Sequence, residues 1–408
     1  LQLFALSDRG YLGQWQLIGD DLVPVRELPG TVEAADCHVD DASQTLYVLE
    51  EGIGVWQYSA APGAKYDRSL LQQYAPQGSL DPEVETFTLA SGRLLVGAVP
   101  VARVTAQSRG DSLPIVVPVA ETAPVPTRGD TADDAAIWLN EQEPENSLVL
   151  ASDKRFGLRA YTLAGDEVAA IGVGRINNVD IRPLQADPRF VALVAGSNRS
   201  RRSISLFGIT AAGAIEWLEE DEIDTGLDDP YGLCLYDDGS TLHVLINDKD
   251  ARLQQWRLSW EAESIRADKL YERRLPDQPE GCVADDAGGR LFYGIEDAGL
   301  FIAPIGPEGI GKGRMLVGVE GTALHADVEG MDLYLDGEGG FLVVSSQGDN
   351  SFAVYERQPP HRYVGSFRIG QNTAVGIDGV SDTDGLALHS GRFGGRFPRG
   401  LLVVQDGK

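Results

Sequence analysis

The sequence predicts an all-β protein built from many short strands, and three observations carry this prediction. Apolar runs of strand length recur along the whole chain, turn residues separate them, and helical periodicity is almost absent. This pattern is typical of a β-sandwich, a β-barrel or a β-propeller. The closest candidate for a helix, residues 253–264, has β-rich flanks and is also expected to be a strand. The clearest strands are expected at residues 147–151, 190–195, 203–207, 242–246, 290–294, 340–345 and 400–404.

An internal repeat indicates how these strands are organised. Three N-terminal segments resemble segments that lie 241, 245 and 244 residues further along the chain. That spacing far exceeds a single propeller blade or solenoid repeat of roughly 20–50 residues, so it predicts duplication of a whole domain. The paired segments are Gly13–Leu17 with Gln254–Leu258, Cys37–Asp41 with Cys282–Asp286, and Leu80–Glu85 with Leu324–Glu329.

The proline-rich stretch 107–128 separates the two copies and has the composition of a linker. We therefore predict a partial, propeller-like domain over residues 1–110 and a complete domain over residues 111–408. The first copy keeps Glu51, Glu83 and Glu85, but it has Ala35 where Glu280 would align. We expect the first domain to be non-catalytic.

Composition excludes several classes of protein. The net charge of −28 and the pI near 4.5 argue against a nucleic-acid partner. No apolar run reaches the length of a transmembrane helix, and no signal peptide is recognisable. The three cysteines, Cys37, Cys234 and Cys282, form no CxxC motif and are odd in number. We expect buried free thiols rather than a disulfide framework.

Carboxylates gather at the expected strand edges. The cluster Asp130–Trp138 runs from an acidic segment directly into an apolar strand, and Glu280 stands at the start of another. Asp327 and Glu329 are two positions apart, so in an extended segment both would face the same side. Carboxylates brought together in this way repel each other unless a cation lies between them. Calcium, which takes six to eight oxygen ligands, is the natural candidate.

Basic residues follow several of the same strands. Lys154, Arg155, Arg199 and Lys249 all stand at strand-to-loop junctions, with Asp250 directly after the last of them. Arginine suits bidentate contacts to phosphate, while lysine serves as a point charge. Metal-binding acids next to these cations predict a site for a phosphorylated polyanion.

These motifs, taken in order, resemble the β-propeller phytases over residues 121–408. That resemblance implies a six-bladed, calcium-dependent propeller that removes phosphate from phytate (inositol hexakisphosphate). The N-terminal repeat is similar to that of dual-domain members, which carry an incomplete propeller ahead of the catalytic one. The motifs are Asp130–Trp138, Gly174–Asp180, Ser197–Ser200, Pro230–Gly232, Glu280–Asp286, Asp327–Gly330, Ser345–Gly348 and Ser381–Gly385.

The resemblance also implies roles for individual residues. Catalytic roles fall to Lys154, Arg199, Tyr231, Lys249 and Glu280, and substrate binding to Lys154, Arg155, Arg199, Lys249 and Asp250. Several Ca²⁺ ions, catalytic and structural, are expected as cofactors. Their implied ligands are Glu121, Asp133, Asp134, Asn177, Asp180, Tyr231, Glu280, Glu296, Asp327, Glu329, Gln347, Asp378 and Asp384.

The implied reaction is hydrolysis of phytate, as its calcium complex, to lower inositol phosphates and inorganic phosphate by a metal-activated water. The enzyme would be of the 3-phytase type and secreted or periplasmic, with the N-terminal domain packed or tethered beside the catalytic one. No RHGxRxP motif is present, which excludes a histidine acid phosphatase. Two alternatives stay open: a non-catalytic, calcium-stabilised propeller that acts as a binding module, and a lactonase-like propeller hydrolase.

Overall fold

The regular secondary structure of the described residues consists almost entirely of antiparallel strands, as predicted. The computed structural model describes the chain except residues 1, 7–11, 19–20, 29–33, 52, 61–67, 75–79, 81–83, 85, 91–92, 97–98, 101–112, 127–130, 262–263, 321, 371, 373–374, 376, 378, 381 and 408. Within the described residues, the only helical segments are single 3-10 turns at Pro144–Asn146, Glu219–Asp221 and Gln347–Asp349. No helix in this part of the chain is long and apolar enough to cross a membrane.

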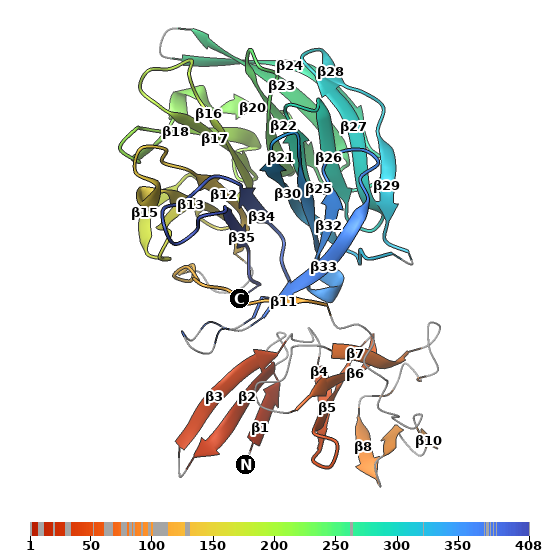
Figure 1. Ribbon diagram of the computed structural model, residues 1–408. Coiled ribbons are helices and arrows are strands. Elements are labelled where there is room, and N and C mark those ends of the chain that lie inside the picture. Colours follow the sequence, from red (N-terminus) through yellow and green to blue (C-terminus); the bar gives the residue numbers. More distant parts are fainter. Residues whose placement is uncertain are drawn as a thin grey trace. The chain divides into compact units, whose positions relative to one another are not determined.

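Two compact units make up the structure. One consists of residues 1–119 and 369–379, and the other of residues 120–368 and 380–408. The predicted boundary at residue 110 lies outside the described residues. The larger unit runs from yellow to blue in Figure 1.

Six sheets of the larger unit form the blades of a β-propeller (Figure 1). The first blade is β12 (Ala132–Trp138), β13 (Leu148–Asp153), β14 (Gly157–Thr162) and β15 (Glu167–Gly172). The second is β16 (Ile176–Pro183), β17 (Ala192–Asn198) and β18 (Ser203–Ile209), with β19 (Ile215–Trp217) and β20 (Ile223–Asp224) both paired to β18. The third is β21 (Pro230–Asp237), β22 (Leu242–Asp248), β23 (Arg252–Glu261) and β24 (Ser264–Arg274).

The remaining three blades continue in chain order. The fourth is β25 (Pro279–Asp285), β26 (Arg290–Ile295) and β27 (Gly299–Gly306), with β28 (Gly309–Ile310) and β29 (Arg314–Gly318) paired to β27. The fifth contains β30 (Val328–Asp336), β31 (Gly339–Ser346), β32 (Ser351–Glu356) and β33 (Tyr363–Ile369). The sixth is the hairpin of β34 (Leu386–His389) and β35 (Leu401–Val404).

The first strand of each blade lines a central channel. These inner strands contact one another in the order β12, β16, β21, β25, β30 and β34, and β34 contacts β12 again, so the ring closes. Apolar side chains fill the space between neighbouring blades. Between the first two blades, for example, Leu150 packs in one cluster with Val194 and Phe207, and all three are fully buried. Each Å² of apolar surface removed from water stabilises the folded state by about 25 cal/mol, so this blade-to-blade packing is the main stabilising term.

Half-buried aspartates add a polar link between neighbouring inner strands. Asp180 Oδ2 accepts a hydrogen bond from Leu235 N at 2.8 Å, and Asp332 Oδ2 accepts one from Leu388 N at 2.6 Å. In both cases the other carboxylate oxygen accepts the next backbone N–H of its own strand. The aspartates therefore satisfy backbone donors that would otherwise be left unpaired at the channel wall.

The smaller unit repeats this architecture in part. Its described residues contain three sheets. The first is β1 (Gln2–Leu6), β2 (Leu12–Ile18) and β3 (Asp21–Leu28), and the second is β4 (Ala34–Asp40), β5 (Thr45–Glu50), β6 (Gly54–Ser59) and β7 (Arg68–Gln73). The third is β8 (Phe87–Ala90), β9 (Arg93–Val96) and β10 (Val99–Pro100). The short strand β11 (Ile115–Val116) also belongs to this unit. Asp36 on β4 accepts a hydrogen bond from Phe87 N at 3.0 Å, as the channel aspartates do. Glu83 and Glu85, which the repeat singled out, lie outside the described residues.

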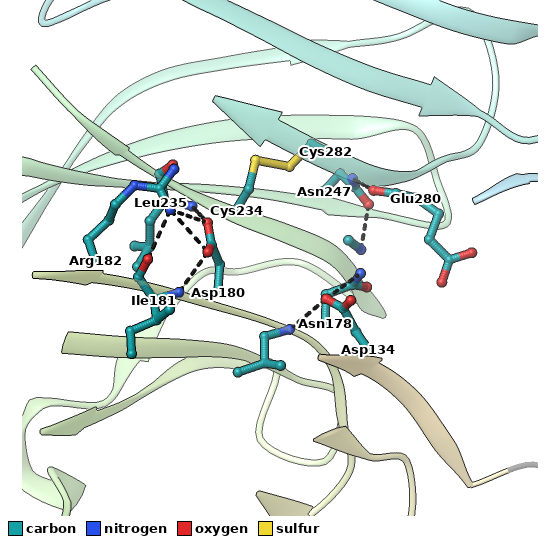
Figure 2. Close-up of a disulfide and its surroundings, with 12 residues drawn as sticks. Asp134, Asn178, Asp180, Ile181, Arg182, Cys234, Leu235, Asn247, Glu280 and Cys282 are labelled. Atoms are coloured by element: carbon teal, nitrogen blue, oxygen red, sulfur yellow. Dashed lines mark hydrogen bonds and ion pairs between the residues drawn. A yellow bond between two sulfur atoms is a disulfide. The ribbon is translucent and has the colours of Figure 1, made fainter. Parts of the chain in front are cut away.

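The cysteines depart from expectation. Cys234 on β21 and Cys282 on β25 form a disulfide, with their Cα atoms 5.8 Å apart, so the prediction of free thiols is wrong for these two (Figure 2). The two residues are 48 positions apart in sequence, and only the adjacency of two inner strands brings them together. Cys37 is a half-buried free thiol, and burial raises its pKa.

Removing the disulfide is expected to destabilise the propeller. A cross-link over about 50 residues stabilises a protein by roughly 2–4 kcal/mol. The double variant Cys234→Ser/Cys282→Ser should therefore melt about 5–15 °C below wild type for a domain of this size. Calorimetry would measure the shift, and Cys37→Ser is the matched control, expected to melt close to wild type. Equal melting temperatures for the double variant and wild type would contradict the prediction.

Candidate active site

One β-bulge, repeated in five inner strands, builds the site at the mouth of the channel. In these five strands, the pairing with the next strand of the blade skips one residue near the start, as between Pro279 and Cys282 in the fourth blade. The same shift occurs in β12, β16, β21 and β30. A bulge of this kind changes the direction in which a side chain points. The first residue inside each bulge, in blade order, is Asp133, Asn177, Tyr231, Glu280 or Glu329.

Close backbone contacts explain why glycine follows several of these residues. The Cβ of any other residue at position 281 would come within 2.4 Å of the Glu329 carbonyl oxygen. Gly330 meets the backbone of Asp384 in the same way, and Gly385 meets Asp134. The small residue lets the inner strands approach at the mouth, which brings the bulge side chains of neighbouring blades together.

Three glutamates form the core of the site. Glu280, Glu296 and Glu329 each place a carboxylate oxygen within 4.8 Å of the others, an arrangement that could hold a metal ion. Burial, followed by the negative charge of Glu280, holds the pKa of Glu329 well above its usual range. Burial and Glu280 also raise the pKa of Glu296 to about 7. The buried Oε2 of Glu329 has no hydrogen-bond partner among the described residues, which fits a cation ligand.

Asp133 and Asp384 form a second carboxylate pair, bridged by Lys154. The Lys154 ammonium lies 2.9 Å from Asp133 Oδ1 and 2.9 Å from Asp384 Oδ2. Burial and Glu280 hold the pKa of Asp133 well above its usual range, although Lys154 acts in the opposite direction. Gln347 Nε2 donates to Asp384 Oδ1 at 2.7 Å. Four predicted site residues from the first, fifth and sixth blades are therefore in direct contact.

Asn177 joins the two carboxylate groups. Its Nδ2 donates to Asp133 Oδ2 at 2.8 Å and to Glu280 Oε1 at 3.1 Å. Its Oδ1 accepts a hydrogen bond from Arg199 Nη1 at 3.1 Å. One buried amide thus connects the acids at the channel mouth to the cation beside them.

Two cations lie close to the ring of Tyr231. The Lys249 ammonium lies 4.2 Å from the centre of the Tyr231 ring, and the Arg199 guanidinium carbon lies 5.5 Å from it. Burial and the charges of Glu280, Glu329 and Glu296 raise the pKa of the Tyr231 hydroxyl, so it stays protonated. The cations and the acids therefore meet at this ring, which places positive charge beside the glutamate core.

Asp327 and Asp134 lie at the edge of the cluster. Burial, Asp297 and Glu280 together raise the pKa of Asp327, and its carbonyl oxygen accepts a hydrogen bond from Gln347 N. Burial raises the pKa of Asp134 to about 8. Asp134 Oδ2 accepts hydrogen bonds from Asn178 Nδ2 and Val179 N, at 3.2 and 3.1 Å (Figure 2).

The structure places other predicted residues away from this core. Asp180 lies further along the channel, beside a cavity of about 350 Å³, where its carboxylate pairs with Arg182 (Figure 2). Glu121 is exposed, and its backbone packs against Gly165 in the turn between β14 and β15. This turn follows the last residue of β14, whereas Gly157 is the first residue of that strand. Arg155 and Asp250 are exposed on the rim. Asp378 lies outside the described residues.

Sequence reasoning missed two residues that hold site residues in place. Gln278 Nε2 donates to Glu296 Oε1, and Asp229 binds Arg199 through two hydrogen bonds. Asp229 stands two residues before Tyr231, and Gln278 stands two before Glu280. Both precede a bulge residue at the same offset, which is the signal that could have identified them.

The fold and the site together define a class: a β-propeller protein whose channel mouth gathers carboxylates and cations. A family model described as phytase matches residues 86–408. A curated 3-phytase from Bacillus subtilis (strain 168) is 34% identical over 298 residues, covering 71% of this chain and 78% of that protein. The chain belongs to the phytase family.

Two solved structures were also compared. The match to a functionally unknown protein from Desulfotomaculum acetoxidans covers 100% of this chain and 99% of that protein, at 11% identity and a TM-score of 0.42. The match to a protein from Lactobacillus plantarum covers 58% of this chain and 70% of that protein, at 13% identity and a TM-score of 0.39. Both TM-scores are too low to bear on function.

Proposed function

We propose that this chain is a calcium-dependent phytase of the 3-phytase type, which hydrolyses phytate to lower inositol phosphates and inorganic phosphate. One observation carries the proposal beyond family membership. Buried carboxylates and the side chains of Lys154, Arg199 and Lys249 meet around a single channel mouth. Such a site can hold cations and a phosphate group side by side.

The residues present fit a divalent cation. Glu280, Glu296 and Glu329 bring three carboxylates within reach of one ion, and Glu329 Oε2 lacks a partner within the described part of the chain. Oxygen ligands of this kind suit calcium. Asp133, Asp384 and Asp327 would extend the same ligand set, with Asn177 and Gln347 as neutral oxygen donors. Bound calcium would neutralise phosphate charge and lower the pKa of a water that attacks phosphorus.

The protein's own cations would orient the phosphate. Arg199 would bind two phosphoryl oxygens, since guanidinium matches phosphate geometry. Lys154 and Lys249 would add point charges where negative charge accumulates in the transition state. Arg199 and Lys249 both lie close to the Tyr231 ring. Arg155, exposed one residue after Lys154, would contact a second phosphate of the same substrate.

The net charge of −28 favours a calcium complex of phytate as the true substrate. An acidic protein repels a free polyanion, and bound divalent cations reverse the local field. The Cys234–Cys282 disulfide supports a secreted or periplasmic location, because disulfides persist in oxidising compartments. In this proposal the smaller unit is a non-catalytic domain tethered to the catalytic propeller.

Phosphate release from calcium phytate, measured with and without EGTA, tests the proposal. We expect turnover with calcium and its loss in EGTA, restored by added calcium. Calcium binding without any phosphate release would instead identify a non-catalytic binding propeller. Hydrolysis of a lactone or carboxylic ester, in preference to phytate, would identify a lactonase-like enzyme.

A further inference from the structure

Arg199 depends on one neighbouring carboxylate for its orientation. Its Nε donates to Asp229 Oδ1 at 2.8 Å, and its Nη2 donates to Asp229 Oδ2 at 2.7 Å. The third nitrogen, Nη1, donates to Asn177 Oδ1 at 3.1 Å. An arginine has five N–H donors, so these three bonds leave two for a ligand.

We propose that Asp229 is a positioning residue, which holds the Arg199 guanidinium so that its two remaining N–H groups face a bound phosphate. The inference rests on the proposed function, in which Arg199 contacts the phosphoryl group. Asp229 itself would not touch substrate or metal.

The geometry explains why such a clamp is needed. Arg199 comes from the turn after β17, where the chain supplies a long side chain with many rotamers. Two parallel hydrogen bonds to one carboxylate fix the plane of the guanidinium as well as its position. Arg199 also donates to Asn177 Oδ1 and lies near the Tyr231 ring, which adds two further contacts. Preorganised donors of this kind stabilise a transition state without further reorientation.

Cations surround the Asp229 carboxylate. Its side chain is 40% exposed, against 13% for Arg199. The Arg199 guanidinium binds this carboxylate directly, and the positive charges of Lys249 and Arg175 also act on it. One carboxylate therefore faces three cations, and it binds Arg199 through two hydrogen bonds.

The backbone explains how Asp229 is held in place. Pro230 follows it directly and begins β21, and Tyr231 is the next residue. Proline restricts the backbone on both sides of the bond. A single short segment therefore delivers both the carboxylate that binds Arg199 and the ring beside it.

The test compares Asp229→Asn with Asp229→Glu and with Asp228→Asn. Asp228 is the matched control: it is 69% exposed and pairs with Arg202 and Arg252, which lie outside the site. In Asp229→Asn, one of the two acceptors becomes an amide N–H that repels the guanidinium. We expect kcat/KM on calcium phytate to fall about 10-fold to 100-fold. Asp229→Glu should recover part of this loss, and Asp228→Asn should match wild type.

Two further readouts separate positioning from a structural role. Calorimetric titration with inorganic phosphate, in the presence of calcium, should show weaker binding to Asp229→Asn, while the melting temperature and its response to calcium stay unchanged. In an Arg199→Ala background, Asp229→Asn should cause no additional loss, because the residue it positions is gone.

Several outcomes would overturn the proposal. Wild-type kinetics and phosphate affinity in Asp229→Asn would do so, as would a loss that simply adds to that of Arg199→Ala. If wild type binds phosphate but releases none from phytate, the proposed function fails, and the phosphate affinities of the variants still decide the role of Asp229. If wild type binds no phosphate, both proposals fail.

Discussion

Glu280→Gln is expected to lower phytate turnover by about two to three orders of magnitude, an effect like that of removing a group that stabilises transition-state charge. Glu280 lies at the centre of the cluster, where Asn177 binds it directly and where its charge shifts the pKa values of Asp133, Glu296 and Glu329. Glutamine keeps the shape but removes one ligand charge. Steady-state kinetics on calcium phytate would measure the loss.

The melting temperature of the metal-free protein, unlike its activity, should not fall in Glu280→Gln. Without metal, Glu280 repels its neighbours, so the chelated variant should melt at or above the temperature of the chelated wild type. Added calcium should then raise the melting temperature of the variant less than that of wild type. Glu216→Gln, an exposed change on β19, is the control and should behave as wild type. Turnover within a few-fold of wild type would remove Glu280 from the centre of the reaction.

Chelation of calcium is expected to produce the second large effect, on stability. Metal binding to the native state contributes RT ln(1 + [L]/Kd), about 2.7 kcal/mol per site at a hundredfold excess over Kd. For a domain of this size that corresponds to on the order of 5–10 °C in melting temperature for each site. Thermal melts in calcium and in EGTA would measure the difference. Identical curves would contradict a calcium-binding role for the cluster.

The chelated protein should also become less stable as pH rises. Burial raises the pKa values of Glu296 to about 7 and of Asp134 to about 8 in the folded state. Between about pH 4 and about pH 8 the folded state therefore holds protons that the unfolded chain has released, and this contribution is lost as pH rises through the folded pKa. We expect the EGTA-treated protein to melt at a higher temperature at pH 5 than at pH 8.

The calcium-loaded protein should show the reverse trend, which provides the internal control. Carboxylates must lose their protons to bind a metal, so calcium affinity falls as pH is lowered. The benefit of calcium to the melting temperature should consequently be larger at pH 8 than at pH 5. A calcium benefit that did not change with pH would argue against buried carboxylates as the ligands.

The disulfide shows where reading the chain in order reaches its limit. The odd number of cysteines and the absence of a CxxC motif pointed to free thiols, yet Cys234 and Cys282 are bonded. Cys234 lies three residues beyond Tyr231, the bulge residue of its strand, and Cys282 lies two residues beyond Glu280. Their pairing depends on β21 and β25 being neighbours in the ring. Spacing along the chain contains no such information.

The predicted ligands divide in the same way. Asp133, Asn177, Glu280, Glu329 and Asp384 meet at the mouth, as their motifs suggested. Asp180 belongs to an equally recognisable motif, but it stands past the bulge of β16, so its carboxylate bonds to the next inner strand instead. A shift of a few residues along a strand moves a side chain from the site to the channel wall.

The sequence by itself determined the strand pattern, the duplication and the chemical character of the site, because these depend on local periodicity and on residue type. The tertiary structure alone decided which blades are neighbours, and therefore which acids share a site, which cysteines bond and which carboxylate orients Arg199. Asp229 and Arg199 are 30 residues apart, and Lys154 and Asp384 are 230 apart. Contacts over such separations arise from closure of the ring, and no local pattern along the chain encodes them.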